Sequence, residues 1–332
     1  MDIIISHKSA LEYWRSYGYK EKPASAAQYR KGAPGSPPGR IRIRDGVPSG
    51  LSRPVNILVS SKTAKRKTKT FKSRVHTGST PDGCFVSIGD EVAVSSPEFC
   101  FFQMAGELPL VKLIELGLEL CGTYSLPAIN TYRPGVETKD EAKYNRPQLT
   151  NIKALKSFTA RMKGVNGYKK ACRALRYIAD GSASPVESIL FMFLTLPHSL
   201  GGYALPLPVL NRRINMSGAA DSKSLKSSYV CDLLWAKAGI AIEYDSDNYH
   251  AGKDRIANDA IKRLDLASVG ILEITVTSRQ LNSPLELEIL AKLISRKVGK
   301  QLRYKPQKFN KASHDLRCDL LWPIKGAENF FP

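Results

Sequence analysis

Short apolar runs, separated by polar stretches rich in glycine and proline, dominate the first 150 residues. Alternating apolar and polar positions are typical of half-buried strands, whereas apolar residues recurring every three to four positions indicate helices. These patterns predict a small, basic α+β domain over residues 1–135, with a mobile linker at 18–54. Its expected elements are a helix at 6–17, a strand at 55–60, a hairpin of 84–88 and 91–95, and a helical region at 97–121.

The second half of the chain has a different order of elements. Residues 122–150 are irregular and proline-rich, so we place the domain boundary there and assign 150–332 to a second domain. The pattern predicts basic helical segments within 151–180, a helix from Ser184, strands at 229–235 and 240–244, a helix at 254–268, a strand at 270–276 and a helix at 284–298. This order is typical of an α/β domain in which helices flank a mixed sheet.

Composition narrows the class of protein. A chain of 332 residues is long enough for two domains, and its hydrophobic fraction of 42% is ordinary for a globular protein. No apolar run is long enough to span a bilayer, and the start does not resemble a secretory signal. We therefore expect a cytoplasmic protein that does not enter membranes. The six cysteines include no Cys-x-x-Cys pair, and we interpret most of them as buried thiols.

Net charge is the strongest compositional signal. The whole chain contains 50 Lys and Arg residues and 30 Asp and Glu residues. The corresponding counts are 22 and 14 in residues 1–150, and 28 and 16 in residues 151–332. Both halves therefore attract polyanions, chiefly DNA or RNA, although acidic lipid is an alternative. The candidate nucleic-acid contacts are Lys62, Lys65, Arg66, Lys67, Lys69, Arg74, Lys169, Arg173 and Arg255.

Carboxylates on two predicted strands are candidates for a metal site. Asp232 lies in an otherwise apolar strand, and Glu243 and Asp245 lie at the end of the next. Neighbouring antiparallel strands can bring Asp232 and Glu243 side by side, and side-chain alternation puts Glu243 and Asp245 on one face. Carboxylates are costly to bury alone, and converging ones suit Mg²⁺, which prefers oxygen ligands. His250 follows these acids closely in the sequence, and Glu187 lies in the first turn of the preceding helix.

Other interpretations of these residues remain open at this point. Asp245 and its neighbours are also typical of a surface turn. A calcium loop is excluded, because His250 occupies the position that such a loop reserves for Gly. The run from Ser184 to Glu187 is a complete helix-capping sequence, which needs no catalytic role. The acids can also pair with basic residues of the following helix, namely Arg255, Lys262 and Arg263.

A longer motif within residues 184–280 resembles a known family of nucleases. The motif is Asp232-x10-Glu243-x-Asp245, then Tyr249-His250, Asp254-Arg255 and Asp259, then an apolar strand. It is similar to the very-short-patch-repair endonucleases of the restriction-endonuclease-like superfamily. The resemblance implies that superfamily's mixed sheet, DNA as substrate, and Mg²⁺ or Mn²⁺ as the cofactor, with no small-molecule cofactor.

The same resemblance implies roles for particular residues. Asp232 and Glu243 would hold the metal, Asp245 would add a ligand or orient the attacking water, and His250 would act near the scissile phosphate as a general acid or a phosphate contact. Glu187 would be the acid that the superfamily often supplies from the preceding helix. The chain departs from the pattern at Asp245, where the superfamily has Lys and the repair enzymes have His, and at Tyr244, where the repair enzymes have Thr.

The first half resembles the AbiEi-type antitoxin proteins of abortive-infection systems. The similarity rests on Val55-Asn-Ile-Leu-Val, the basic run, Arg74-Val-His76 and Val94-Ser-Ser-Pro97 before an apolar helix. It implies a role in phage defence and a toxin partner, although residues 1–50 contain no evident winged helix. Two functions follow from the sequence: a metal-dependent DNA endonuclease, or a DNA-binding regulator that uses an inactive nuclease fold.

Overall fold

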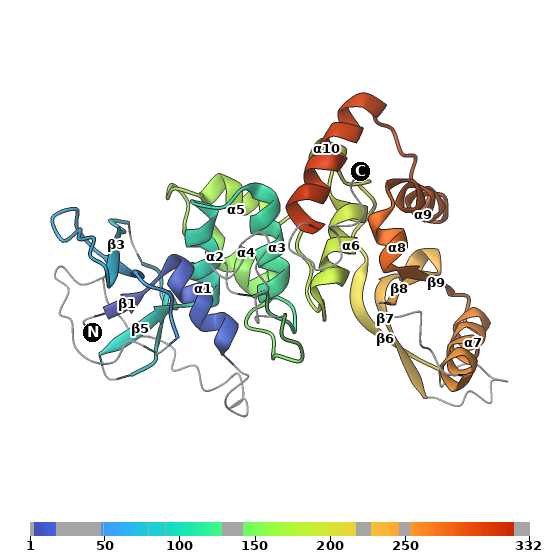
Figure 1. Ribbon diagram of the computed structural model, residues 1–332, viewed down its shortest axis with the longest axis horizontal. Helices are drawn as coiled ribbons and strands as arrows, with labels where there is room; N and C mark the ends of the chain where they lie inside the picture. The colour runs from blue at the N-terminus through green and yellow to red at the C-terminus, as the bar shows by residue number, and fades with distance from the viewer. Residues whose placement is uncertain are drawn as a thin grey trace. The chain divides into compact units, whose positions relative to one another are not determined.

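The structure, a computed structural model, describes residues 3–17, 48, 50–78, 80–89, 91–127, 142–216, 227–245 and 253–321. The chain divides into two compact units, Met1–Ile178 (unit 1) and Ala179–Pro332 (unit 2) (Figure 1). Most of the expected linker at 18–54 lies outside the described residues. Within the described ranges, no helix combines the length and the apolar character that crossing a membrane requires.

Unit 1 contains a mixed sheet with the strand order β3-β2-β1-β5-β4. β1 runs parallel to β5 and antiparallel to β2, β2 and β3 are parallel, and β4 and β5 form the expected antiparallel hairpin. The strands are β1 (Ile3–Ile5), β2 (Val55–Val59), β3 (Phe71–Val75), β4 (Phe85–Ser87) and β5 (Val92–Ser95). The helices are α1 (His7–Ser16), α2 (Pro97–Ala105), α3 (Leu110–Leu120), α4 (Ile152–Arg161) and α5 (Tyr168–Ala174).

The boundary between the units lies later in the chain than the sequence suggested. Helices α4 and α5 belong to unit 1, whereas the loss of pattern at 122–150 led us to expect them in the second domain. The physical reason is the apolar face of α4. Leu155 and Phe158 are buried there, and the Phe158 ring lies 5.8 Å from the ring of Phe99 in α2. The irregular stretch is therefore a connection within unit 1.

A buried ion pair joins the first and third helices of unit 1. The Arg15 guanidinium donates hydrogen bonds of 2.8 and 2.7 Å to the two carboxylate oxygens of Glu119. Arg146 is also buried and donates to the backbone carbonyls of Glu119 and Trp14. Because a two-pronged arginine–carboxylate contact fixes orientation as well as distance, this cluster holds α1 against α3.

Unit 2 is a mixed sheet flanked by helices, as the sequence predicted. The strand order is β6-β7-β8-β9, with antiparallel pairing along β6-β7-β8 and parallel pairing of β8 with β9. The strands are β6 (Val209–Asn215), β7 (Ser228–Trp235), β8 (Ile240–Asp245) and β9 (Leu272–Thr277). The helices are α6 (Pro185–Thr195), α7 (Lys253–Ser268), α8 (Ser278–Asn282), α9 (Pro284–Lys297) and α10 (Pro306–Leu321), with short 3₁₀ turns at His198–Leu200 and Ala236–Ala238.

The turn between β7 and β8 sets the register of the two central strands. Gly239 adopts a left-handed conformation with φ of 57°, and a Cβ atom there would collide with the carbonyl oxygen of Gly270. Only glycine satisfies both demands without strain. The N–H of Leu272 donates to the Gly239 carbonyl, so the same turn also anchors the start of β9.

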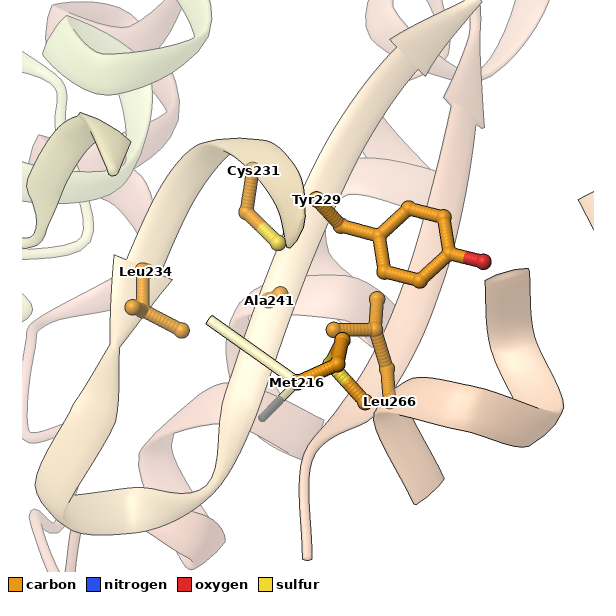
Figure 2. Close-up of a cluster of buried hydrophobic side chains, with 6 residues drawn as sticks. All are labelled: Met216, Tyr229, Cys231, Leu234, Ala241 and Leu266. Carbon is orange, nitrogen blue, oxygen red and sulfur yellow. The ribbon is translucent and has the colours of Figure 1, made fainter. Parts of the chain in front are cut away.

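Helix α7 packs on the central strands through a small apolar cluster, shown in Figure 2. Leu266 of α7 is fully buried in it together with Ala241 of β8. Beside the cluster, the Tyr229 hydroxyl donates a 2.6 Å hydrogen bond to Asp265 of α7. The remaining members are Met216, Tyr229, Cys231 and Leu234. This contact fixes which face of α7 lies over β8.

Candidate functional site

Polar residues lie at neighbouring positions on the four strands of unit 2. Asn211 of β6 lies between the residues that pair with Leu233 and Cys231, which places it beside Asp232 of β7. The pairs of β7 with β8 end at Leu233 and Ile242, so Asp232 and Glu243 are the first residues past this ladder. Glu243 pairs in turn with Thr275 of β9. Thus all four strands contribute a polar residue to this part of the sheet.

Asp232 is held by the backbone of the neighbouring strand. The N–H of Tyr244 donates a 2.8 Å hydrogen bond to Oδ2 of Asp232. Burial nevertheless raises the pKa of the Asp232 carboxyl above its usual value, against the opposing effects of this hydrogen bond and of Lys262. The Asp232 side chain therefore has a fixed position but an incompletely stabilised charge.

Glu243 lies on the face of β8 that α7 covers. It is two residues from Ala241, so alternation gives both side chains the same direction, and Lys262 precedes Leu266 by one helical turn. The Lys262 ammonium lies 3.0 Å from Oε1 of Glu243. Burial, and after it the charge of Asp232, raises the pKa of Glu243 to about 7 despite this contact.

The basic side chains of α7 join two carboxylates of adjacent strands. Lys262 lies 3.8 Å from Glu273 of β9, and Arg263 approaches the same carboxylate at 3.8 Å. Burial by itself would lower the pKa of Lys262, but Glu243 and then Glu273 raise it, so the ammonium stays charged. Oε1 of Glu243 and Oε2 of Glu273 are buried without a hydrogen bond of good geometry. The ion pairs therefore satisfy these oxygens only in part.

Glu187 both caps a helix and approaches Asp232. Its N–H donates to the Ser184 hydroxyl at 3.1 Å, as expected of the capping sequence. Its Oε2 accepts hydrogen bonds from the N–H of Ala183 and, at 2.6 Å, from the Asn211 side chain. Burial, followed by the negative charge of Asp232, raises the pKa of Glu187. The capping and site interpretations therefore describe one arrangement and do not exclude each other.

Asn211 has an unusual backbone conformation for a residue within a strand. Its φ is 46°, in the left-handed region that asparagine tolerates better than most residues. Its side-chain amide donates to Glu187 and also to the carbonyl of Gly181 at 2.9 Å. Asn211 thereby ties the start of α6 to the position beside Asp232.

The remaining predicted site residues fall near this part of the sheet or outside the described residues. Asp245 ends β8 and pairs with Thr277, on the same face as Glu243 by alternation. His250 lies outside the described residues, and the Arg255 side chain, on α7, is likewise not described. Within the described ranges, no set of three His, Cys, Asp or Glu side chains is close enough to share a metal ion.

The chemistry of the site suits a hard divalent cation. Asp232 and Glu243 offer carboxylate oxygens, the ligand type that Mg²⁺ and Mn²⁺ favour. The charge of Asp232 raises the pKa of Glu243 and of Glu187, so ionising these groups together is unfavourable. A cation bound near Asp232 and Glu243 would reduce that penalty, and these two carboxylates offer the ligand type that it requires.

Of the predicted nucleic-acid contacts that lie in unit 1, all but one are exposed. Five of them lie on the loop before β3, which bonds to that strand through Arg66 and Ser73, and two lie on α5. The exception is Arg74, whose guanidinium makes a 2.6 Å ion pair with Glu107 and a hydrogen bond to Asn56. The exposed residues are Lys62, Lys65, Arg66, Lys67, Lys69, Lys169 and Arg173.

Two residues of the site were not assigned to it from the sequence. Lys262 appeared only as one of several possible ion-pair partners, and Asn211 did not appear at all. Lys262 has a recognisable signal, a lysine one turn from the buried Leu266 on an amphipathic helix that follows the acidic strand. Asn211 has none, because its role depends on a backbone conformation.

Comparisons with models of protein families, with curated proteins and with solved structures found no match to this chain.

Proposed function

We propose that this chain is a DNA-binding, divalent-metal-dependent endonuclease with its active site at Asp232 and Glu243. The observation that carries the proposal is the placement of two partly buried carboxylates just past the β7–β8 ladder, with Glu243 and Glu187 both within electrostatic range of Asp232. Buried carboxylates that repel one another are found together more often at functional sites than elsewhere in proteins. The order α6, β6-β7-β8, α7, β9 supports a restriction-endonuclease-like assignment of unit 2.

Asp232 and Glu243 would hold the cation, which when bound supplies a Lewis acid for the phosphate and an activated water. The chain's own residues prepare this position. The Tyr244 N–H fixes the Asp232 carboxylate, and Asn211 fixes Glu187 beside it. Lys262 lies 3.0 Å from Glu243 and favours its ionised form.

Lys262 also offers an explanation for the departure at Asp245. The superfamily pattern places a lysine at that strand position, whereas this chain brings a charged lysine to the same acid from α7. In the proposed reaction this ammonium would offset negative charge that develops on the phosphate. Asp245 would act as a further ligand or orient the water, and His250 would contact the phosphate.

The basic surfaces of unit 1 would hold the DNA backbone. The exposed cations of the 62–69 loop and of α5 are suited to phosphate contacts, which give affinity without reading sequence. Between α4 and α5 a shallow hollow of about 200 Å³ carries Lys156 and Arg176 at its rim. The resemblance of unit 1 to abortive-infection antitoxins suggests phage defence as the setting of the proposed activity, with a toxin as a further partner.

A second candidate function is a DNA-binding regulator without turnover. The ion pair of Lys262 with Glu243 favours it, because that contact balances part of the acidic charge without any metal. The two candidates differ in a single assay. Purified protein is incubated with supercoiled plasmid and with short duplexes, in EDTA, Mg²⁺ or Mn²⁺. Metal-dependent nicking supports the nuclease, whereas binding without nicking in any metal supports the regulator and rejects our proposal.

A further inference from the structure

Helix α9 carries an apolar face that the described residues of unit 2 leave exposed. One side of the helix is buried in the unit through Leu287, Ala291 and Ile294. On the other side, Leu285, Ile289 and Leu293 have 68%, 59% and 37% of their surface exposed. Isolated exposed leucines are common, but residues spaced by four lie above one another on a helix. These three side chains therefore form one continuous stripe along α9, which we name the α9 stripe.

Charges beside the α9 stripe are divided along the helix. The first half contains Glu286 and Glu288, and the second half contains Lys292, Arg296 and Lys297. Favourable interactions with the helix dipole account for part of this division. The division also determines how two copies of α9 can pair. Two α9 helices side by side in parallel would oppose acid to acid and base to base, whereas an antiparallel pair opposes each acidic half to a basic half.

We propose that the α9 stripe is the interface of a symmetric homodimer, in which α9 of one copy packs antiparallel against α9 of a second copy. A twofold axis near the middle of the stripe makes the surface complementary to itself. In one such register Ile289 meets Leu293 of the partner subunit, and Glu286 meets Arg296 of the partner subunit. The acids and bases flank the apolar contact, as in other helix pairs.

The size of the contact limits its strength. Protein interfaces that bury less than ~1,200 Å² are typically weak or transient, and a single pair of helices buries less than this. The dimer is therefore a reversible one that forms in the micromolar range of concentration. It gives one assembly two copies of each basic surface, and so increases avidity for a long polyanion. The inference does not depend on the proposed nuclease activity.

Sedimentation velocity of the full chain, from low to high micromolar concentration, tests the proposal. The wild type should shift from monomer to dimer, and Ile289→Glu should stay monomeric over the same range, with self-association at least about tenfold weaker. The matched control is Leu264→Glu on α7, where the leucine is 73% exposed and has no place in the stripe. That variant should dimerise like the wild type.

Charge reversal tests the antiparallel arrangement. Glu286→Arg and Arg296→Glu should each weaken the dimer, and the two changes combined in one chain should restore it. Thermal melts followed by circular dichroism accompany each variant. A wild type that is monomeric throughout overturns the proposal, as does an Ile289→Glu protein that dimerises normally. At a protein concentration where the wild type is also monomeric, a melting temperature of Ile289→Glu well below that of the wild type also overturns it, because the stripe would then be covered within the chain.

Discussion

The Lys262 ammonium of α7 lies 3.0 Å from Oε1 of Glu243 in β8, and its charge also reaches Glu273 at 3.8 Å. One lysine is thus shared by two buried or half-buried acids on neighbouring strands. Burial of these acids outweighs the attraction, because the pKa of each carboxyl remains raised. Lys262, with Arg263 beside Glu273, therefore does not fully offset the acids of the site, and the proposed divalent ion would add the missing positive charge.

Replacing Lys262 should reveal this imbalance. Lys262→Met removes the ammonium and leaves Glu243 with its charge uncompensated. We expect a loss of about 1–3 kcal/mol in the free energy of unfolding at pH 8, because a partly buried carboxylate without a partner is costly. The loss should shrink at pH 5, where Glu243 is protonated. Urea denaturation at both pH values measures it, with Lys262→Arg as the control. An equal loss at both pH values would assign the effect to packing.

Glu243 itself should make stability depend on pH. Its folded pKa of about 7 is above that of the unfolded chain, so the unfolded state releases its proton first as the pH rises. The contribution of Glu243 is most favourable below about pH 4.5 and is progressively lost up to about pH 7.

Glu243→Gln should remove this dependence. We expect the variant to gain on the order of 1 kcal/mol over the wild type at pH 8, a figure reduced for screening of the partly exposed pair. At pH 4.5 the two proteins should differ little. Denaturation curves across this range give the comparison. If the free energy of unfolding changes by the same amount between pH 5 and pH 7 in the wild type and in Glu243→Gln, the assignment is contradicted.

Much of unit 2 could be predicted from the sequence because its signals are local. The apolar run of β7, the glycine turn and the run of β8 specify a hairpin, and the hairpin brings Asp232 and Glu243 to the end of the same ladder. The capping sequence from Ser184 to Glu187 likewise fixes the start of α6. Where a short segment contains both a periodic pattern and its stop signal, the element follows.

Other parts could not be predicted because they depend on distant contacts. β6 was missed, since Arg212 and Arg213 interrupt its alternation at the edge of the sheet. The unit boundary was misplaced, because the partner of Phe158 is Phe99, far away in the sequence.

Asn211 should be replaceable by glycine more easily than by alanine. Asn211→Gly keeps the left-handed backbone but loses the hydrogen bonds to Glu187 and Gly181. Asn211→Ala loses the same bonds and also strains the backbone, which costs of order 1–2 kcal/mol more. Equilibrium denaturation of both variants gives the difference. Equal stabilities would mean that the backbone at β6 relaxes, and the requirement for a left-handed conformation at Asn211 would have to be withdrawn.

DNA binding should be strongly dependent on salt and should involve the loop before β3. If about five phosphates are neutralised, the logarithm of affinity should fall with the logarithm of salt at a slope near −4.5. Lys65→Glu combined with Lys67→Glu should weaken binding to all sequences alike and reduce the slope by about 1–2. Reversing Lys308 and Lys311 on α10 is the matched control. Fluorescence anisotropy over a salt series measures both, and a flat wild-type profile would count against backbone contacts.

The most direct test of the proposed activity is Asp232→Asn. Asparagine preserves the size of the side chain and can still accept the Tyr244 hydrogen bond, but it removes the charge that would hold a divalent ion. It also relieves the repulsion that raises the pKa of Glu187 and Glu243, so the variant should be as stable as the wild type or more so. DNA affinity in EDTA should be unchanged, because the exposed basic residues of unit 1 are intact.

Two readouts then separate the hypotheses. In plasmid nicking with Mg²⁺ or Mn²⁺, the variant should be inactive. In thermal melts, added Mn²⁺ should raise the melting temperature of the wild type at pH 8 and leave that of the variant unchanged. A metal-induced shift that is equal in both proteins would place the ion elsewhere, and nicking by Asp232→Asn at the wild-type rate would remove Asp232 from the active site even if the chain is a nuclease.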